Sequence, residues 1–154
     1  MRIPKRQKEQ SLEPTKYKVR ILLFGTRGFN DRKRFHNDMC DMIETHADEP
    51  ILFISGAANT GADRLIIEWC RKFGYPCLEM PADWKNPKGF NEKLGYNPTA
   101  GFERNESMAR IATYGLGYWD GVSTGTADMI DRLEKRNVSY TFKHIPVQER
   151  KRER

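Results

Sequence analysis

The sequence predicts an α/β fold with a mostly parallel sheet of about five strands flanked by helices. Short apolar runs alternate with segments of helical periodicity from residue 17 to residue 145. This alternation is typical of domains in which each strand is followed by a crossover helix. The first apolar run ends in Ile21-Leu22-Leu23-Phe24. An unbroken apolar run indicates a strand that is buried on both faces, as the strands of parallel sheets are.

The predicted elements follow one another in a regular order. We expect strands at residues 17–24, 50–55, 75–80, 115–119 and 138–145. Apolar side chains three and four residues apart predict a helix over residues 31–46, a second helix that ends near Phe73, and a third that opens within residues 100–108. Residues 127–135 form the fourth helix, with Met129, Ile130 and Leu133 on one face.

Length and charge divide the chain into one domain and two tails. A chain of 154 residues favours a single domain, which we place at residues 17–146. Residues 1–20 hold seven Lys or Arg and two Glu, and residues 147–154 hold four and two. The total charge of +6 therefore leaves −1 on residues 21–146. We expect a flexible basic arm at residues 1–16 and a basic tail at residues 147–154, either of which could contact nucleic acid weakly.

Composition excludes several classes of protein. No apolar run reaches the ~20 residues of a membrane span, and no signal-peptide pattern follows the N-terminus. The three cysteines, Cys40, Cys70 and Cys77, form no Cys-x-x-Cys pair, which favours free thiols and a cytoplasmic location. We expect no metal site, no cofactor beyond a bound ligand, and no association with a membrane.

Ligand-binding residues are predicted where the strands end. In open parallel sheets, ligands bind at the carboxyl ends of the strands, near the point where the strand order reverses. Loops rich in small and polar residues follow the predicted strands, and a helix with Arg104 near its start lies between two of them. The candidate ligand-binding residues are Gly25, Thr26, Arg27, Ser55, Gly56, Ala57, Asp63, Asp83, Trp84, Arg104, Asn105, Ser123, Thr124, Gly125, Thr126 and Asp128.

The turn between the fourth strand and the fourth helix is the strongest of these candidates. A helix that opens directly after a strand presents free N–H groups and a positive dipole end, which suit a phosphate. Ser123, Thr124 and Thr126 could add hydroxyl donors, or they could serve only as helix caps. Arg27 is either a counter-charge for the phosphate or an exposed loop arginine. Thr60 and Asp63 have the spacing of a capping box, which is the structural alternative for Asp63.

The long connection at residues 81–99 carries Trp84, Phe90 and Tyr96. Connections of this length are usually functional or disordered, and the aromatic residues argue against simple disorder. We expect either a lid that stacks on a base or a contact between subunits.

Five motifs in order resemble one family. They read Gly25-x-Arg27-x-Phe29, Ser55-Gly56-Ala57-x-x-x-Gly61-Ala62-Asp63, Ala82-Asp83-Trp84, Ala100-Gly101-x-x-Arg104-Asn105-x-x-Met108 and Ser123-x-Gly125-Thr126-x-Asp128-Met129-Ile130. Together they resemble the YspA/YpsA-related branch of the SLOG superfamily, a relative of the DNA-processing Smf and Lonely Guy proteins. The resemblance implies a Rossmann-like fold, a nucleotide or nucleotide-derived ligand, and a homo-oligomer. The branch is common in bacteria and their phages, so the resemblance is compatible with a phage origin.

The chain departs from the Lonely Guy enzymes, which release a base from nucleoside 5′-monophosphates. Their motif reads Pro-Gly-Gly-x-Gly-Thr-x-x-Glu, and Met129 occupies the glutamate position here. Methionine cannot stabilise an oxocarbenium-like transition state as a carboxylate does. Catalytic residues therefore stay unassigned, with Asp63, Asp83 and Glu103 as possible substitutes, and whether the chain is an enzyme stays open.

Three functions remain after this comparison. The first is a nucleotide-ligand binding protein that acts as sensor, carrier or sequestering agent. The second is an N-glycosidase or phosphoribohydrolase with a displaced carboxylate, which the missing glutamate opposes. The third is a nucleic-acid-binding module that uses the basic tails, which the near-neutral domain opposes.

Overall fold

A computed structural model describes residues 1–46 and 48–148, and the predicted tail beyond residue 148 lies outside the described residues. The elements are a 3-10 turn η1 (Pro14–Lys16), β1 (Val19–Gly25), α1 (Arg32–Thr45), β2 (Ile51–Ser55), α2 (Gly61–Phe73), β3 (Cys77–Glu79), α3 (Ala100–Ile111), β4 (Tyr114–Trp119), α4 (Thr124–Lys135) and β5 (Ser139–His144). All four strand pairings are parallel. The predicted α/β class with a parallel five-stranded sheet is confirmed.

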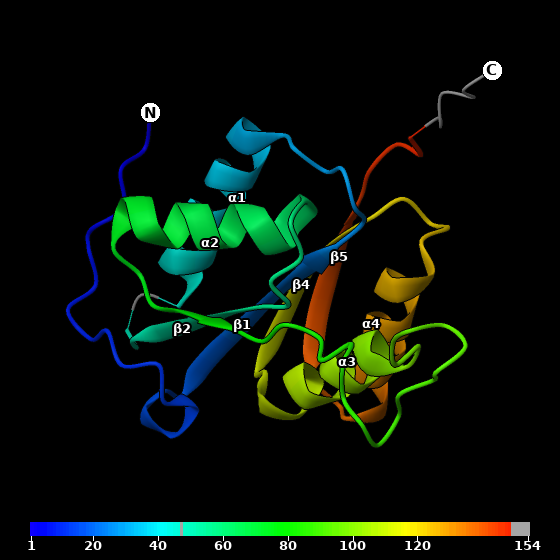
Figure 1. The fold of residues 1–154 in the computed structure, drawn as a ribbon. Coiled ribbons are helices and arrows are strands. Elements are labelled where there is room, and N and C mark those ends of the chain that lie inside the picture. Colours follow the sequence, from blue (N-terminus) through cyan, green and yellow to red (C-terminus); the bar gives the residue numbers. More distant parts are fainter. Residues whose placement is uncertain (47, 149–154) are drawn as a thin grey trace.

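The strand order is β3-β2-β1-β4-β5, a Rossmann-like arrangement. The order reverses between β1 and β4, whose carboxyl ends lie side by side because Gly25 pairs with Tyr118. Figure 1 shows α1 and α2 on one side of the sheet and α3 and α4 on the other. The point at which the order reverses, called the switch point below, therefore lies at the carboxyl edge of the sheet between the two helical layers. Parallel sheets commonly bind ligands there.

Each helical layer encloses its own apolar core. The larger core joins α1 and α2 to one face of the sheet and includes the fully buried Ile21, Phe53 and Ile66. The smaller core joins α3 and α4 to the other face through Leu22, Phe24, Ile54, Met108, Ala109, Ala112, Met129 and Leu133. Alternate residues of β1 thus face opposite cores, which explains its unbroken apolar sequence.

Two element boundaries differ from prediction in ways that matter for the site. Helix α4 begins at Thr124, three residues earlier than predicted, so Gly125 and Thr126 lie in its first turn. Their small and hydroxyl side chains suggested a loop, but the first turn of a helix tolerates such residues well. Strand β3 is shorter than predicted and ends at Glu79.

The N-terminal arm lies against the domain. The side-chain amide of Gln7 donates to the Ile51 carbonyl at 2.9 Å and its oxygen accepts the Ile51 N–H at 2.9 Å. Arg2 pairs with Asp41 and Glu44 of α1 at 2.8 and 2.6 Å. The flexibility predicted for residues 1–16 stays a prediction, but the contacts show that the arm covers the start of β2 and one side of α1.

We expect Gln7→Ala to lower the free energy of unfolding by about 1–3 kcal/mol, because it leaves the part-buried Ile51 N–H and carbonyl without partners. Lys8→Ala, at the exposed neighbouring position, is the matched control and should change stability by less than ~0.5 kcal/mol. Urea unfolding of both variants provides the measurement. Equal stabilities would show that the arm does not stay on the domain in solution.

Candidate functional site at the carboxyl edge of the sheet

The ends of β1 and β4 are tied together by Thr26. Its N–H donates to the Tyr118 carbonyl at 2.8 Å, and its hydroxyl oxygen accepts the Asp120 N–H at 3.2 Å. A Cβ at Gly25 would lie 2.6 Å from the Tyr118 carbonyl oxygen, so only glycine fits there. Gly25 and Thr26 thus keep the ends of β1 and β4 together, and Thr26 is buried. Both were predicted to bind ligand; the contacts give them a structural role in addition.

Asp120 organises the turn that follows β4. Its carboxylate accepts the N–H groups of Val122 and Ser123 at 2.9 and 2.8 Å, together with the Ser123 hydroxyl at 2.9 Å. The Ser123 hydroxyl, predicted as a donor to phosphate, is therefore already used. Sequence reasoning missed Asp120, although an Asp that precedes Gly after a strand is a recognisable turn signal.

The first turn of α4 has free backbone donors. Ser123 occupies the N-cap position but supplies no side-chain capping bond. Within the described part of the chain, the N–H groups of Thr124, Gly125 and Thr126 have no hydrogen-bond acceptor. Gly125 is exposed, and a Cβ there would have no atom within 4 Å. The geometry is therefore open to an anion at the positive end of the helix dipole.

Arg104 and Asn105 join the two neighbouring strand-end loops. Arg104 Nη1 donates to the Gly56 carbonyl after β2 at 2.6 Å. Asn105 Nδ2 donates to the Gly125 carbonyl in α4 at 3.3 Å. The two side chains also contact each other, because Arg104 Nε donates to Asn105 Oδ1 at 3.2 Å. The start of α3 therefore fixes the β2–α2 loop relative to the first turn of α4.

Asp128 is held within the helical layer. Its Oδ2 accepts from Asn105 Nδ2 at 3.0 Å and from Arg132 Nε at 2.8 Å. Arg132 also pairs with Glu106 at 2.8 Å. Asp128 thus orients Asn105, and its carboxylate is already neutralised by an arginine.

The β2–α2 loop is closed by its own hydrogen bonds. Ser55 Oγ donates to the Asp63 carbonyl at 2.7 Å and accepts the Ala57 N–H at 3.0 Å. Ala57 adopts a positive φ of 59°, which is uncommon outside glycine. Thr60 makes no side-chain capping bond, and Asp63 Oδ2 accepts from the Ala58 N–H at 3.2 Å. The capping box that Thr60 and Asp63 suggested does not form.

Gly56 makes room for protein side chains. A Cβ at Gly56 would lie 2.8 Å from Asp63 Oδ2 and 2.9 Å from Arg104 Nη1. The carboxylate and the guanidinium therefore pack over the same backbone position. Burial raises the pKa of Asp63, against the lowering effects of the Ala58 N–H and the charges of Arg104 and Arg27. Burial likewise lowers the pKa of Arg104.

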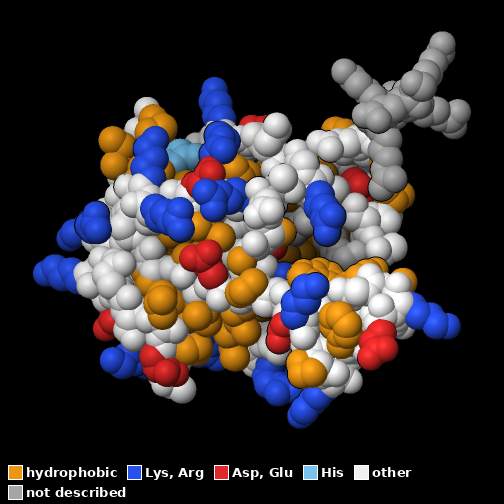
Figure 2. Space-filling model, in the orientation of Figure 1, with side chains coloured by type: hydrophobic (Ala, Val, Ile, Leu, Met, Phe, Trp, Pro, Cys, Tyr) orange, Lys and Arg blue, Asp and Glu red, His pale blue; other side chains and the backbone are white. Residues whose placement is uncertain are grey.

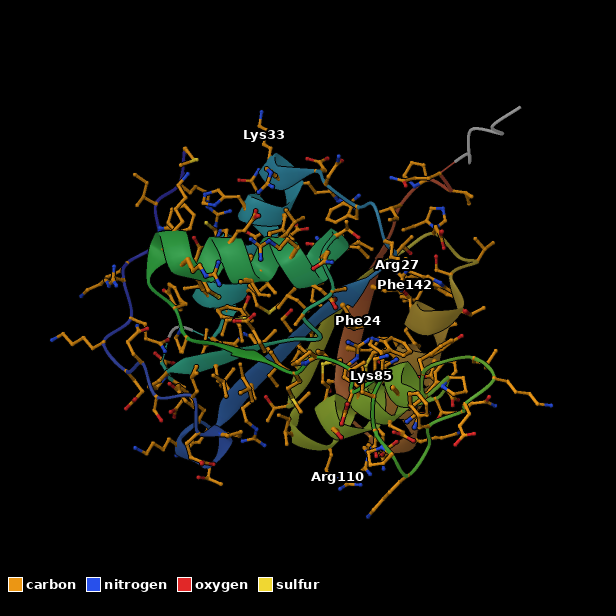
Figure 3. The ribbon with its side chains drawn as sticks, in the orientation of Figure 1. Phe24, Arg27, Lys33, Lys85, Arg110 and Phe142 are labelled. Atoms are coloured by element: carbon orange, nitrogen blue, oxygen red, sulfur yellow. The ribbon has the colours of Figure 1, made fainter. Side chains whose placement is uncertain are left out.

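Arg27 is the exposed cation of this cluster. It follows β1 at the carboxyl edge of the sheet. Figure 3 shows it far from Arg110, which lies near the end of α3. Among the described residues its guanidinium has no ion-pair or hydrogen-bond partner. Its charge acts on both Asp63 and Arg104. Arg27 is therefore placed to meet an anionic ligand without breaking an existing contact.

Trp84 attaches the 81–99 segment to α3. A Cβ at Gly101 would lie 3.3 Å from the Trp84 ring, and Trp84 packs edge-on against Tyr96 with ring centroids 6.0 Å apart. The Trp84 side chain stays 42% exposed. Asp83 is exposed, and its carboxylate accepts only the nearby Lys85 N–H at 3.3 Å among the described residues. The structure thus brings Trp84, but not Asp83, into contact with α3.

The face drawn in Figure 2 carries hydrophobic side chains over the region where the 81–99 segment and α3 lie in Figure 1. The exposed ones in this region include Trp84, Phe90, Leu94, Tyr96 and Phe102. In residues 1–46 and 48–148, no cluster of three His, Cys, Asp or Glu side chains could hold a metal ion. No helix in the same described ranges is both long and apolar enough to cross a membrane.

We expect Asp63→Asn to change how stability depends on pH. Because the folded pKa of Asp63 is raised, the folded state binds this proton more tightly than the unfolded state does. The parent's free energy of unfolding should therefore fall, relative to the Asn variant, as the pH rises from about 4 through the folded pKa. Urea unfolding across this pH range tests it, with the exposed Asp131→Asn as control. A stability difference that does not vary with pH would contradict the prediction.

Comparison with known proteins gives a match to one family. Residues 19–86 match the sequence model of the YspA, cpYpsA-related SLOG family. This span covers β1 to β3 and includes Arg27, Gly56, Asp63 and Trp84. No curated protein and no solved structure matches the chain.

Proposed function

Because residues 19–86 match the YspA, cpYpsA-related SLOG family, we propose that the protein binds a nucleotide or nucleotide-derived ligand at the carboxyl edge of its sheet. The family match supports a nucleotide-related ligand in general.

The observation that carries the proposal is the uncapped first turn of α4. The N–H groups of Thr124, Gly125 and Thr126 converge at the switch point with no acceptor among the described residues. A phosphate is the group that such a turn binds best, since it accepts several N–H bonds and gains from the helix dipole. Arg27, in the loop after β1, and Arg104, near the start of α3, supply positive charge.

The start of α3 is where the parts of the site meet. The Trp84 ring lies beside Gly101, Arg104 donates to the Gly56 carbonyl and Asn105 donates to the Gly125 carbonyl. The 81–99 segment, the β2–α2 loop and the first turn of α4 are thus all held by two turns of one helix. A ligand whose phosphate binds α4 would extend toward Trp84, and the exposed part of that ring could stack on a base.

We place the protein in the cytoplasm as a sensor, carrier or sequestering agent in nucleotide signalling or in conflict between phage and host. The exposed aromatic residues of the 81–99 segment support a homo-oligomer, because apolar side chains gathered on a surface commonly mark a contact between proteins.

A hydrolase is the second candidate, and Asp63 is the observation that favours it. Its carboxyl is buried beside Arg104 with a raised pKa, which suits a general acid. Asp128 is a poorer candidate because Arg132 and Asn105 already bind it. If the protein releases base from nucleoside 5′-monophosphates, Asp63→Asn should stop the reaction while leaving the fold intact.

A thermal-shift screen tests the proposal. A ligand that binds only the folded state at 100 times its Kd should stabilise the protein by ~2.7 kcal/mol. We expect a rise in Tm with at least one of the mononucleotides, dinucleotides, cyclic nucleotides or ADP-ribose derivatives at millimolar concentration. The Trp119 indole N–H, which donates to the Ser123 carbonyl beside α4 at 3.1 Å, should shift in the NMR spectrum with the same ligand. No stabilisation by any of these compounds would overturn the proposal.

A further inference from the structure

We propose that the groove between α1 and α2 is a second binding site, which takes a small organic anion with an apolar body, such as an aromatic carboxylate. The groove lies on the opposite helical layer from α3 and α4 (Figure 1). None of the residues that line it belongs to the switch-point site. It therefore adds a function to the proposed nucleotide site and does not rest on it.

The size and the floor of the groove suit a small ligand. Its volume is about 490 Å³, within the ~300–1,000 Å³ of typical small-molecule sites. The floor consists of Phe35, Leu65, Trp69 and Phe73. Trp69 and Phe73 are tilted against each other with ring centroids 4.9 Å apart. This floor offers aromatic surface on which a flat apolar group can pack.

The polar atoms of the floor are already paired with protein groups. Trp69 Nε1 donates to His36 Nδ1 at 3.0 Å. His36 Nε2 therefore carries the proton and donates to the Arg2 carbonyl at 2.6 Å. The floor thus presents only apolar surface to a ligand, and specificity for polar groups has to come from the rim.

The rim carries positive charge. Arg32 is paired with Glu68 at 2.6 Å, whereas Lys33 and Lys72 have no acidic partner within residues 1–46 and 48–148. Lys33 lies on α1 near the top of Figure 3. Lys72 Nζ lies 5.4 Å from the centre of the Phe73 ring, directly beside the floor. The Lys72 ammonium beside the aromatic floor, with Lys33 also lining the groove, matches a ligand with one anionic group and an apolar body.

The N-terminal arm bounds the groove without filling it. Met1 lines one side, yet its side chain is 85% exposed. Arg2, fixed by Asp41, Glu44 and His36, holds this part of the arm in place. The arm is thus held at one side of the groove between α1 and α2, and it leaves the groove open to a ligand.

Anilinonaphthalene sulfonate, which has aromatic rings and one anionic group, is the probe for the test. We expect it to bind with increased fluorescence and to shift the indole N–H signal of Trp69 in the NMR spectrum. The indole signals of Trp84 and Trp119, which report on the 81–99 segment and on the turn before α4, should stay in place. A shift of Trp84 or Trp119 in place of Trp69 would overturn the proposal.

A charge-reversal variant and an uncharged probe test whether the groove selects an anion. Lys72→Glu should weaken binding of the probe at least about fivefold, because it reverses a charge close to the anion. Lys88→Glu makes the same change on the exposed 81–99 segment and should leave binding unchanged. N-Phenylnaphthylamine, the same ring system without the sulfonate, should bind at least about fivefold more weakly than the sulfonate. Equal affinities of the parent and Lys72→Glu, or of the two probes, would overturn the proposal.

Discussion

Gly125→Asp is expected to abolish nucleotide binding while leaving the protein folded. Gly125 is exposed and does not have a positive φ, and a Cβ added to it would have no atom within 4 Å, so a side chain fits without strain. The new carboxylate would lie beside the free N–H groups of Thr124 and Thr126 and would repel a phosphate from them. The same charge should favour the helix dipole by ~0.3–1 kcal/mol, which argues against unfolding.

Two controls separate the charge from the bulk at this position. Gly125→Ala adds only a methyl group in open space and should keep both the fold and most of the affinity. Gly125→Asn has nearly the shape of Asp without its charge, so it should bind better than Gly125→Asp. Calorimetric titration with the nucleotide that gives the largest thermal shift provides the measurement. Parent-like affinity in a folded Gly125→Asp protein would show that the phosphate binds elsewhere.

The sequence predicts the architecture because apolar runs and helical periodicity respond to burial, and the three central strands β1, β2 and β4 are buried between the two helical layers. The strand order β3-β2-β1-β4-β5 was not predicted, because several orders fit the same alternation of strands and helices. The carboxyl edge follows without the order, because parallel strands all end at the same edge of the sheet. Arg27, Gly56, Arg104 and Gly125 were all predicted at this edge, and the hydrogen bonds of Arg104 and Asn105 connect its loops.

Hydrogen-bond partners could not be predicted in the same way. Ser123 could donate to a phosphate or to protein, and the choice depends on where Asp120 lies after β4 has formed. Gly56 could make room for a ligand or for side chains, and the choice depends on Arg104, 48 residues later in the chain. The arm shows the same limit, because nothing local in its polar sequence indicates that Gln7 pairs with the backbone of Ile51.

Met129→Glu, which introduces the residue of the Lonely Guy motif, is expected to destabilise the protein rather than to create a hydrolase. Met129 is 1% exposed and packs in the core between α4 and the sheet with Leu22, Phe24 and Leu133. A carboxyl group there would lose its hydration and gain no partner. We expect the free energy of unfolding to fall by ~3–6 kcal/mol at neutral pH, the range that pKa shifts of buried glutamates imply.

The pH dependence of this loss distinguishes a buried carboxylate from simple misfit. Burial should raise the folded pKa of the new Glu above its unfolded value, so the folded state retains the proton and the variant loses stability as the pH rises from about 4. The deficit relative to the parent should therefore be smaller at pH 5 than at pH 8. Met129→Leu, which conserves volume without adding charge, should cost less than ~1.5 kcal/mol at both pH values. A Met129→Glu protein as stable as the parent at both pH values would contradict the prediction. It would show that the new carboxylate reaches solvent, and a Lonely Guy type of hydrolysis would then have to be tested.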